Sequence, residues 1–600
     1  MNQLSRYSFF VCALVLTAGA FFYYPKWQQP NTEATISWDV AGYYLYLPAI
    51  FIYDDLKTLS FGEAMLDKYH SAPELSAFPH PSGNRVIKYS GGQALQYLSW
   101  FLCGHLGARM LGYPADGFSL PYQFALSMGS LLVAMLGLWF LRKVLLRFYS
   151  DRTTAITLLL VALGTNYMEY TAFHGALTHN WLFTLYAILL YASIRFYEKP
   201  SYFLAAVIGV LVGWAALTRP TDIIAAIIPL AWGIGSWAEV AGRLRFWRGQ
   251  LKKLALAAFL TAAVGFIQLA YWKYVTGEWI VYSYQDQGFS WLRPHVLNGL
   301  FSYRAGWLVY SPVMVFALLG FVSLARQQAR LLPAILVFCC LYMYITFAWD
   351  IWWYGGSLGQ RAMVQSYPVW ALALAAFVEW AFRQKWVLKA VLGVLAGLFI
   401  WYNFWLTHQA HQGGLFKVGE MTKAYFWKIL GKSEVEENAI KLLDSKDEVR
   451  GERENIRLLY SNDFESDTIQ CPLPAISGNN SLYLNESRQS SPVYDIPLPE
   501  PGTRWIRVAA DFRCEQKEWD VWKMTQLVVR YSNKGEKVKE NLIRIYRLLD
   551  SGQTRNLYID SKLPKKTFDS IQVFLWNGDS PKMLLIDGLR VEAFSEKSLF

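Results

Sequence analysis

Long apolar runs constrain this chain more than any other feature of its sequence. Eleven of them approach the roughly 20 residues of a membrane-spanning helix, at about 7–24, 119–141, 154–172, 180–197, 202–217, 221–239, 252–272, 306–325, 331–349, 364–382 and 387–406. The composition agrees, because 54% of the residues are hydrophobic and only 17% are charged. These runs predict a polytopic α-helical membrane protein. No small-residue cleavage site follows the first run, which we therefore expect to remain as an anchor.

Basic clusters predict how the runs are oriented. RKVLLR (142–147), RLRFWRGQLKK (243–253), RQQAR (326–330) and RQK (383–385) all fall on one side of the predicted bundle, and that side is expected to be the cytoplasm. This distribution accounts for the net charge of +11 without nucleic-acid binding. The apolar segment 91–112 is expected to be an interfacial or re-entrant helix, because a twelfth crossing would move every later basic cluster outside.

The remaining sequence divides the chain into three parts. Residues 1–410 form the predicted membrane domain, with a large first outer loop at 25–118, and residues 411–454 form a hinge and helical connector. In 455–600, short alternating runs such as WIRVAADFRC and IQVFLWNG predict an extracytoplasmic all-β sandwich of jelly-roll type. Cys471 and Cys514 lie in this part, and the sequence leaves open whether they form a disulfide or remain two thiols. We expect the protein in a bacterial inner membrane, with its N-terminus in the cytoplasm.

Two carboxylates lie close to the predicted outer face of the membrane. Asp39 stands in SWDVAGYYLYLP, where the i, i+4 spacing would place it on one helix face with Tyr43. Glu169 lies near the outer end of its run, before His174 and His179. A carboxylate at such a depth is costly unless it is paired, which favours a function. The simpler alternatives are a solvated helix cap for Asp39 and a side chain that reaches water for Glu169.

The sequence does not predict a metal site from histidine spacing. His174 and His179 are five residues apart, which is not the spacing of a helical zinc pair. No bound metal is therefore expected from the motifs alone. Mg²⁺ or Mn²⁺ bridging a carboxylate and a phosphate would nevertheless suit the chemistry of the predicted outer face.

Cationic side chains gather on the same predicted face. Arg85, Lys88, Arg219 and Arg361 are candidates for binding an anionic phosphate, because guanidinium groups offer paired donors. Arg304 and Trp353 join Tyr43, His174 and His179 as possible substrate contacts. Ordinary contact with lipid headgroups is the alternative for each cation. Glycines beside Lys88 and Arg361, in YSGGQ and WYGGSLGQR, are expected to let backbone amides approach an anion closely.

Several fragments resemble those of the GT-C superfamily of polytopic glycosyltransferases. They include IKYSGGQALQYLSWFLCGHL, GTNYMEYTAFHGALTHNW, LTRPTDIIAAIIPL and WDIWWYGGSLGQRAMVQSYP, and the similarity covers roughly residues 1–410. The pattern is most similar to the branch that contains protein O-mannosyltransferases and the bacterial aminoarabinose transferase of lipid A. The segment K-Y-S-G at 88–91 departs from the K-P-P-L pattern of that branch.

The resemblance implies a function and residue roles. The donor would be a sugar on a polyprenyl phosphate, and Asp39 would be the catalytic base or a metal-associated carboxylate. Glu169 would be the second functional carboxylate, and Arg361 would contact the donor phosphate. The expected reaction is a single inverting transfer to a glycan, lipid or protein acceptor outside the cytoplasm. A transporter or flippase for a lipid-linked sugar and a non-catalytic glycan-binding membrane protein remain as alternatives.

Overall fold

The chain forms two compact units, Met1–Gly419 and Glu420–Phe600. The structure is a computed structural model that describes residues 3–449, 451–467 and 469–597. The connector expected at 411–454 is divided between the units, because its helices α19 (Lys423–Ile429) and η7 (Glu437–Leu443) belong to the second one. Each unit has its own hydrophobic core.

The first unit is a bundle of helices, and the runs that the sequence predicts as spans lie largely in helical structure, with non-helical breaks at 165–168 and 232–236. Its elements include α1 (Leu4–Ala18) with the π-helical turn η1 (Gly19–Tyr23), α6 (Leu120–Leu145), α7 (Asp151–Gly164), the π-helical turn η4 (Glu169–Phe173), α8 (Thr178–Glu198), α9 (Tyr202–Thr218), η5 (Pro220–Ala226), α10 (Ile227–Ala231), α12 (Leu251–Thr276), α13 (Val296–Phe301), α14 (Trp307–Tyr310), α15 (Met314–Gln327), α16 (Leu332–Ala348), η6 (Arg361–Ser366), α17 (Tyr367–Ala381) and α18 (Trp386–His411). Among the described residues, five helical segments are long and apolar enough to cross a membrane, and four shorter ones are also apolar. The predicted integral membrane protein is thereby confirmed at this level.

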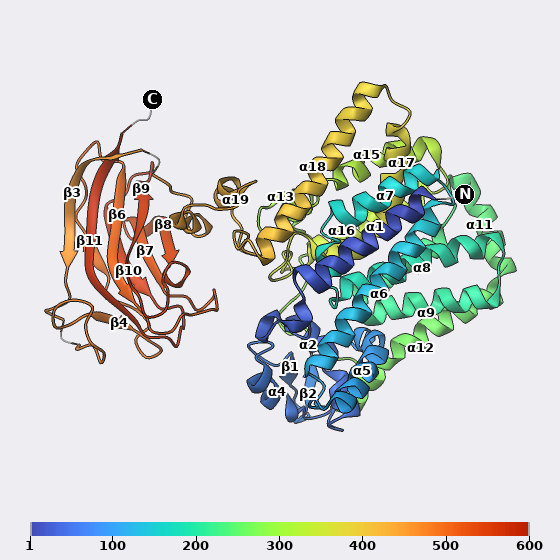
Figure 1. Ribbon diagram of the computed structural model, residues 1–600, viewed down its shortest axis with the longest axis horizontal. Coiled ribbons are helices and arrows are strands. Elements are labelled where there is room, and N and C mark those ends of the chain that lie inside the picture. The colour runs from blue at the N-terminus through green and yellow to red at the C-terminus, as the bar shows by residue number, and fades with distance from the viewer. Residues whose placement is uncertain (1–2, 450, 468, 598–600) are drawn as a thin grey trace. The chain divides into compact units, whose positions relative to one another are not determined.

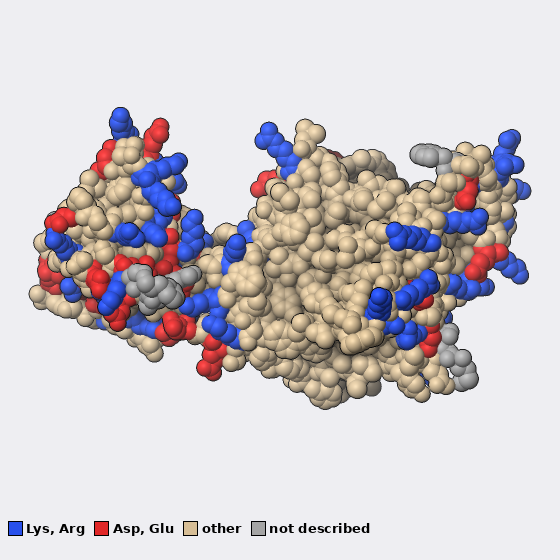
Figure 2. Space-filling model, turned by 90° about the horizontal axis from the view of Figure 1, so that it is seen from above, with Lys and Arg blue, Asp and Glu red and all other residues tan. Residues whose placement is uncertain are grey.

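The bundle exposes a large apolar surface, and its contact with water would be unfavourable. On α18, Val394, Leu398 and Trp401 are each more than half exposed, and most of α12 is also uncovered by other parts of the chain. Figure 2 shows a broad surface without charged side chains over the middle of this unit, whereas Lys and Arg gather at its right-hand end. Such a large apolar surface is stable only against lipid.

The segment between α1 and α6 folds over one end of the bundle (Figure 1). It contains η2 (Lys26–Gln28), η3 (Asn31–Glu33), α2 (Trp38–Tyr44), α3 (Tyr46–Phe51), α4 (Phe61–Tyr69), a hairpin of β1 (Ala77–Pro79) and β2 (Arg85–Ile87), and α5 (Gly92–Leu111). The basic helix α11 (Trp237–Gly249) and the N-terminus lie at the other end. α5 coincides with the segment expected to be interfacial or re-entrant, and it is not among the five candidate spans.

Gly92 allows the start of α5 to touch the end of α9. A Cβ atom at Gly92 would lie 2.4 Å from the backbone nitrogen of Thr218 and 2.5 Å from the carbonyl carbon of Leu217. The Trp214 indole donates a hydrogen bond of 2.9 Å to the Gly92 carbonyl. This glycine in YSGGQ therefore serves helix packing, in contrast to the anion contact expected from the sequence.

The second unit is an antiparallel β-sandwich. One sheet has the order β5 (Tyr494–Ile496), β10 (Ser570–Trp576), β7 (Gln526–Asn533), β8 (Glu536–Arg544), and the other β3 (Arg453–Asn462), β11 (Leu584–Glu596), β6 (Trp505–Arg513), β9 (Thr554–Lys562), with β4 (Leu482–Leu484) also on β11. Buried and open positions alternate along β6 and β10, as the period of two predicts. The chain passes repeatedly between the sheets, as in double-sheet jelly rolls.

The two cysteines of the sandwich are free thiols. Cys514 is buried, and its Sγ lies 2.9 Å from the carbonyl oxygen of Met583. Cys471 is half-buried in the loop that precedes β4. The sequence leaves open a disulfide or two thiols at Cys471 and Cys514, and the structure has two thiols.

Replacement of Gly92 by alanine should destabilise the membrane unit. The added methyl group has no space against the α9 backbone, and overpacking of this kind costs about 1–3 kcal/mol. Thermal unfolding of the purified protein in detergent should show a lower midpoint for Gly92→Ala. The matched control is Gly265→Ala on α12, where nothing lies within 4 Å of the added atom and the midpoint should hardly change. Equal midpoints for the two variants would contradict this account of Gly92.

Candidate functional site

A cavity of about 350 Å³ opens among the segments that connect the helices of the first unit. Among the described residues that line it, Asp39 of α2 is the one carboxylate, and the three cations Lys88, Arg219 and Arg361 line the same cavity. Aromatic side chains form a large part of the remaining wall, namely Tyr43, Tyr89, Tyr282, Tyr284, Phe289, Tyr342, Trp349 and Tyr354. A concave site with few polar groups and apolar walls is typical of ligand-binding pockets.

The carboxylate of Asp39 is held by two partners. Arg361 Nη2 lies 2.5 Å from Asp39 Oδ2, and the Tyr89 hydroxyl donates a hydrogen bond of 2.7 Å to Oδ1. Burial by itself raises the pKa of the Asp39 carboxyl, but the charge of Arg361 and the hydrogen bond from Tyr89 outweigh it and hold the pKa below its ordinary value. Asp39 is therefore ionised at neutral pH in this state.

Local geometry directs Asp39 and Tyr43 into the cavity. α2 begins at Trp38, whose positive φ of 49° is unusual for a large residue and is typical of functional sites. Tyr43 follows Asp39 by one helical turn, and its ring stacks on Tyr89 with 4.2 Å between centroids. Gly42 allows this approach, because a Cβ atom there would lie 2.6 Å from the Tyr89 ring. The shared helix face predicted from the i, i+4 spacing is present.

A buried polar network supports the cationic side of the cavity. Gln365 Nε2 donates to both oxygens of Asp222, at 3.0 and 2.8 Å, and Tyr186 donates to the same carboxylate at 2.7 Å. The amide oxygen of Gln365 therefore faces His179 Nδ1, 2.8 Å away, and must accept its proton. Arg219 Nη1 lies 3.5 Å from the same His179 nitrogen. Arg219 thus lies beside this network, and its guanidinium is 5.5 Å from the centroid of the Tyr354 ring.

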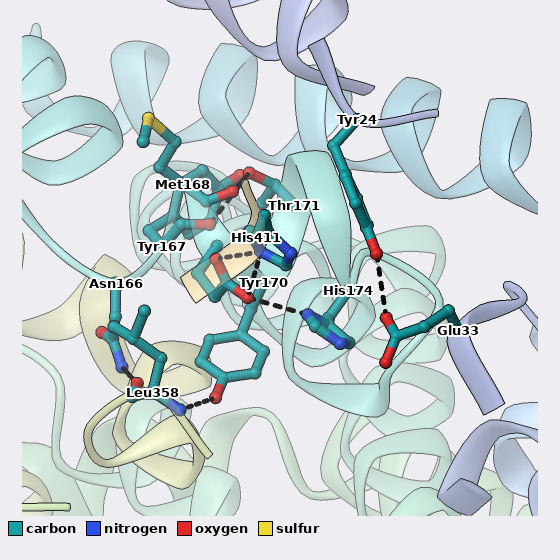
Figure 3. A network of polar contacts seen from close by, with 11 residues as sticks. Tyr24, Glu33, Asn166, Tyr167, Met168, Tyr170, Thr171, His174, Leu358 and His411 are labelled. Atoms are coloured by element: carbon teal, nitrogen blue, oxygen red, sulfur yellow. Dashed lines mark hydrogen bonds and ion pairs between the residues drawn. The ribbon is translucent and has the colours of Figure 1, made fainter. Parts of the chain in front are cut away.

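Glu169 is not among the residues that line the cavity. It belongs to a second polar cluster with His174 and His411, both of which are labelled in Figure 3. His174 Nδ1 is 2.8 Å from Glu169 Oε1, and His411 Nε2 is 3.0 Å from both carboxylate oxygens. Tyr170 lies between this second cluster and the cavity. Its ring contacts those of His174 and His179, with centroid distances of 6.3 and 5.7 Å.

Three further predicted residues also lie outside the cavity lining. Arg85 forms an ion pair of 2.8 Å with Glu63. Arg304 donates a hydrogen bond of 2.8 Å to the Gly419 carbonyl and stacks on Trp353 at 3.9 Å from its ring centroid. The structure thus brings Asp39, Tyr43, Lys88, His179, Arg219 and Arg361 to one cavity. It places Glu169, His174, Arg85, Arg304 and Trp353 elsewhere, which corrects their expected grouping in one site.

Sequence reasoning missed residues that shape the cavity. Tyr89 directly follows Lys88 in the chain, and Asp222 stands three residues after Arg219 in TRPTD, so proximity to a cation was the available signal. Gln365 carries no such signal, because nothing in its sequence surroundings marks it as the partner of Asp222. His411 lies 242 residues from Glu169 and was likewise not identified.

The cavity lining offers one carboxylate, that of Asp39, to a Mg²⁺ or Mn²⁺ ion. Such an ion is commonly held by one or two carboxylates together with substrate phosphates and water. Arg361 and Tyr89 engage both oxygens of Asp39 in this state, so an ion there would have to displace one of them. Among the described residues, the group with suitable metal-ligand spacing is Glu169, His174 and His411.

Comparisons with known proteins give limited similarity. No protein-family model matches the chain, and no curated protein is significantly similar to it. Among solved structures, the arabinosyltransferase EmbB from Mycobacterium smegmatis is similar with a TM-score of 0.38 and 12% sequence identity. The match covers 98% of this chain and 64% of EmbB, so the chain spans less than two thirds of the length of that protein.

Removal of the Arg361 charge should raise the pKa of Asp39. In Arg361→Gln the burial that raises the pKa of the carboxyl remains, while the largest of the interactions that lower this pKa is lost. Infrared pH titration, with the Asp39 carboxyl band isolated by subtraction of an Asp39→Asn sample, should show protonation at a higher pH than in the wild type. Arg85→Gln is the control, since Arg85 pairs with Glu63. An unchanged titration in Arg361→Gln would contradict the assigned role of the ion pair.

Proposed function

We propose that the protein is a membrane glycosyltransferase of GT-C type that moves a sugar from a polyprenyl-phosphate donor to an acceptor hydroxyl outside the cytoplasm. The observation that carries this proposal is the convergence of Asp39 with Lys88, Arg219 and Arg361 in one cavity. A general base and a set of phosphate-binding cations are the two requirements of this reaction. The resemblance of residues 1–410 to the branch with protein O-mannosyltransferases and the aminoarabinose transferase supports the same assignment.

The donor phosphate is proposed to bind between the cations. Arg361 and Arg219 offer guanidinium donors to its oxygens, and Lys88 adds a charge beside Tyr89 and Tyr284. The cavity of about 350 Å³ lies within the range of small-ligand sites. Its aromatic wall offers flat surfaces for the apolar face of a sugar ring and for the first prenyl units.

The proposed mechanism is a single displacement. The acceptor oxygen attacks the anomeric carbon and gives its proton to Asp39. The bond from this carbon to the phosphate oxygen breaks, and the polyprenyl phosphate leaves with the electron pair. Lys88, Arg219 and Arg361 stabilise the negative charge that grows on the leaving phosphate. Inversion at the anomeric carbon follows from attack opposite the leaving group.

Donor binding is proposed to activate Asp39. While Arg361 pairs with Asp39, the low pKa makes the carboxylate a weak base. A bound phosphate competes for the same guanidinium, and loss of that partner in a buried site raises the basicity of Asp39. The base would thus gain strength when a donor is present.

Glu169 is proposed to act on the cavity through its neighbour Tyr170. The Tyr170 hydroxyl accepts a hydrogen bond of 3.0 Å from the backbone amide of Leu358, which lies in the loop that leads to Arg361. The Glu169 carboxylate is directed at His174 and His411. This arrangement favours a positioning role over direct contact with the reacting atoms.

The proposed topology has eleven crossings, a cytoplasmic N-terminus and an extracytoplasmic β-sandwich in a bacterial inner membrane. The basic helix α11 lies at one end of the bundle, while the elements that carry Asp39 lie at the opposite end (Figure 1). Cytoplasmic segments carry the excess of Lys and Arg. The cavity would therefore open on the outer side, where polyprenyl-phosphate sugars act as donors.

A flippase for a lipid-linked sugar is the second candidate, favoured by the same cations and aromatic wall. Such a protein would move the intact donor and would need no base. Release of polyprenyl phosphate separates the two functions, because only a transferase breaks the sugar–phosphate bond.

Asp39→Asn should abolish transfer while leaving donor binding largely intact. The amide cannot accept the proton of the acceptor hydroxyl, so kcat should fall by about 10²–10⁴-fold. The assay incubates detergent-purified protein with a panel of polyprenyl-phosphate sugars and measures polyprenyl phosphate release. Gel filtration and the thermal midpoint of the variant control for folding. Full activity in Asp39→Asn would remove Asp39 from the mechanism, and absence of release by wild-type protein across the panel would favour the flippase.

Lys88→Gln should weaken donor binding more than it slows catalysis. Loss of one cation at a partly desolvated phosphate removes a charge-assisted contact of about 1.5–3 kcal/mol, which corresponds to a 10- to 150-fold rise in the apparent KM for donor. Arg85→Gln removes a cation from the same segment, three residues earlier, and should leave the KM unchanged. Equal effects of the two substitutions would argue against a phosphate site at Lys88.

A further inference from the structure

Glu169, His174 and His411 form a cluster of three metal-ligating side chains. Their nearest ligand atoms all lie within 4.8 Å of one another. The side chains of Glu169 and His411 are only 3% and 5% exposed, and that of His174 is half-buried. Two imidazoles and one carboxylate are a donor set that Zn²⁺ and related divalent ions use in proteins.

The distances suit a shared ion. A tetrahedral ion at roughly 2.0–2.2 Å from each ligand places its ligand atoms roughly 3.3–3.6 Å apart. The observed separations from Glu169 oxygens are 2.8 Å to His174 Nδ1 and 3.0 Å to His411 Nε2. Small side-chain movements would therefore admit an ion.

The π-helical turn η4 brings Glu169 and His174 of this cluster together. The amide of His174 donates to the Glu169 carbonyl at 2.9 Å, an i to i+5 bond that aligns side chains five residues apart. π-helical turns occur frequently at functional sites. η1 packs directly on η4, because a Cβ atom at Gly19 would lie 3.2 Å from Ala172 and from Phe173. His411, the last residue of α18, supplies the third ligand.

The surroundings favour a cation at this place. Glu33 is a second carboxylate near both histidines, and it accepts a hydrogen bond of 3.1 Å from Tyr24. Buried Lys26 interacts with Glu33 and with Glu169. Lys26 therefore supplies one positive charge beside two carboxylates, and His174 and His411 lie next to Glu169. The rings of Tyr24 and Phe173 cover His411, with centroid distances of 4.7 and 4.6 Å, and limit access of water.

We propose that Glu169, His174 and His411 bind one divalent transition-metal ion, with Zn²⁺ as the best-suited ion. Three protein ligands leave one coordination position for water or another oxygen ligand. The ion joins the end of α18 to η4, segments that are 242 residues apart. It is separate from the Asp39 cavity, so the proposal does not depend on the glycosyltransferase assignment.

Metal content of the full-length protein tests this proposal directly. Purified wild-type protein is equilibrated with Zn²⁺, passed through a desalting column and analysed by inductively coupled plasma mass spectrometry, with an expected stoichiometry of about one ion per chain. Glu169→Gln and His411→Ala should each reduce the bound Zn²⁺ at least tenfold. Co²⁺ substitution should give visible d–d absorption bands in the wild type that both variants lack.

His408→Ala is the matched control. His408 lies one turn before His411 on α18 and contacts the Tyr23 hydroxyl at 2.5 Å, so its loss disturbs the same helix end without removing a ligand. It should retain Zn²⁺ and the Co²⁺ bands. Gel filtration and circular dichroism establish that each variant is folded. Wild-type protein without bound metal, or equal metal content in the wild type, Glu169→Gln and His411→Ala, would overturn the proposal.

Discussion

The ion pair between Asp39 and Arg361 is the interaction on which the cavity depends. Its partners are 322 residues apart in the chain, and each stabilises the charge of the other, because an unpaired charge at a partly buried position is unfavourable. The fold must therefore bring α2 and the loop before η6 together. The segments that form the cavity are constrained by this contact as well as by the packing of the helices.

The aromatic wall strengthens the electrostatic interactions of the charged groups in the cavity. Tyr43, Tyr89, Tyr284 and Tyr354 replace water around the cations, and electrostatic interactions strengthen as water is removed. The same hydroxyl that orients Asp39, from Tyr89, also stabilises its charged form. An anionic ligand would enter a site where cations outnumber the carboxylate, and it would compete with Asp39 for Arg361. Binding of the anionic ligand and the gain in basicity of Asp39 would then both result from this competition for Arg361.

The sequence predicted features that depend on local periodicity. Apolar runs predicted the helices, alternation predicted strands such as β6 and β10, and the i, i+4 spacing placed Asp39 and Tyr43 on one face. It could not predict the alignment of Glu169 with His174, because α-helical periodicity separates residues five positions apart and only a π-helical turn brings them together. Partners remote in the chain, such as His411, leave no local pattern, since tertiary packing alone selects them.

Tyr170 contacts both the cluster of Glu169, His174 and His411 and the surroundings of the Asp39 cavity. Glu169 precedes it directly in η4, its ring contacts His179 beside the cavity, and its hydroxyl holds the backbone of Leu358 three residues before Arg361. The π-helical turn cannot shift without moving both the ring and this hydrogen bond. A bound ion at the Glu169 cluster would hold a turn that contacts the loop carrying the guanidinium that pairs with Asp39. Precise placement of that group matters because charge stabilisation depends on donors that are already in position when charge develops.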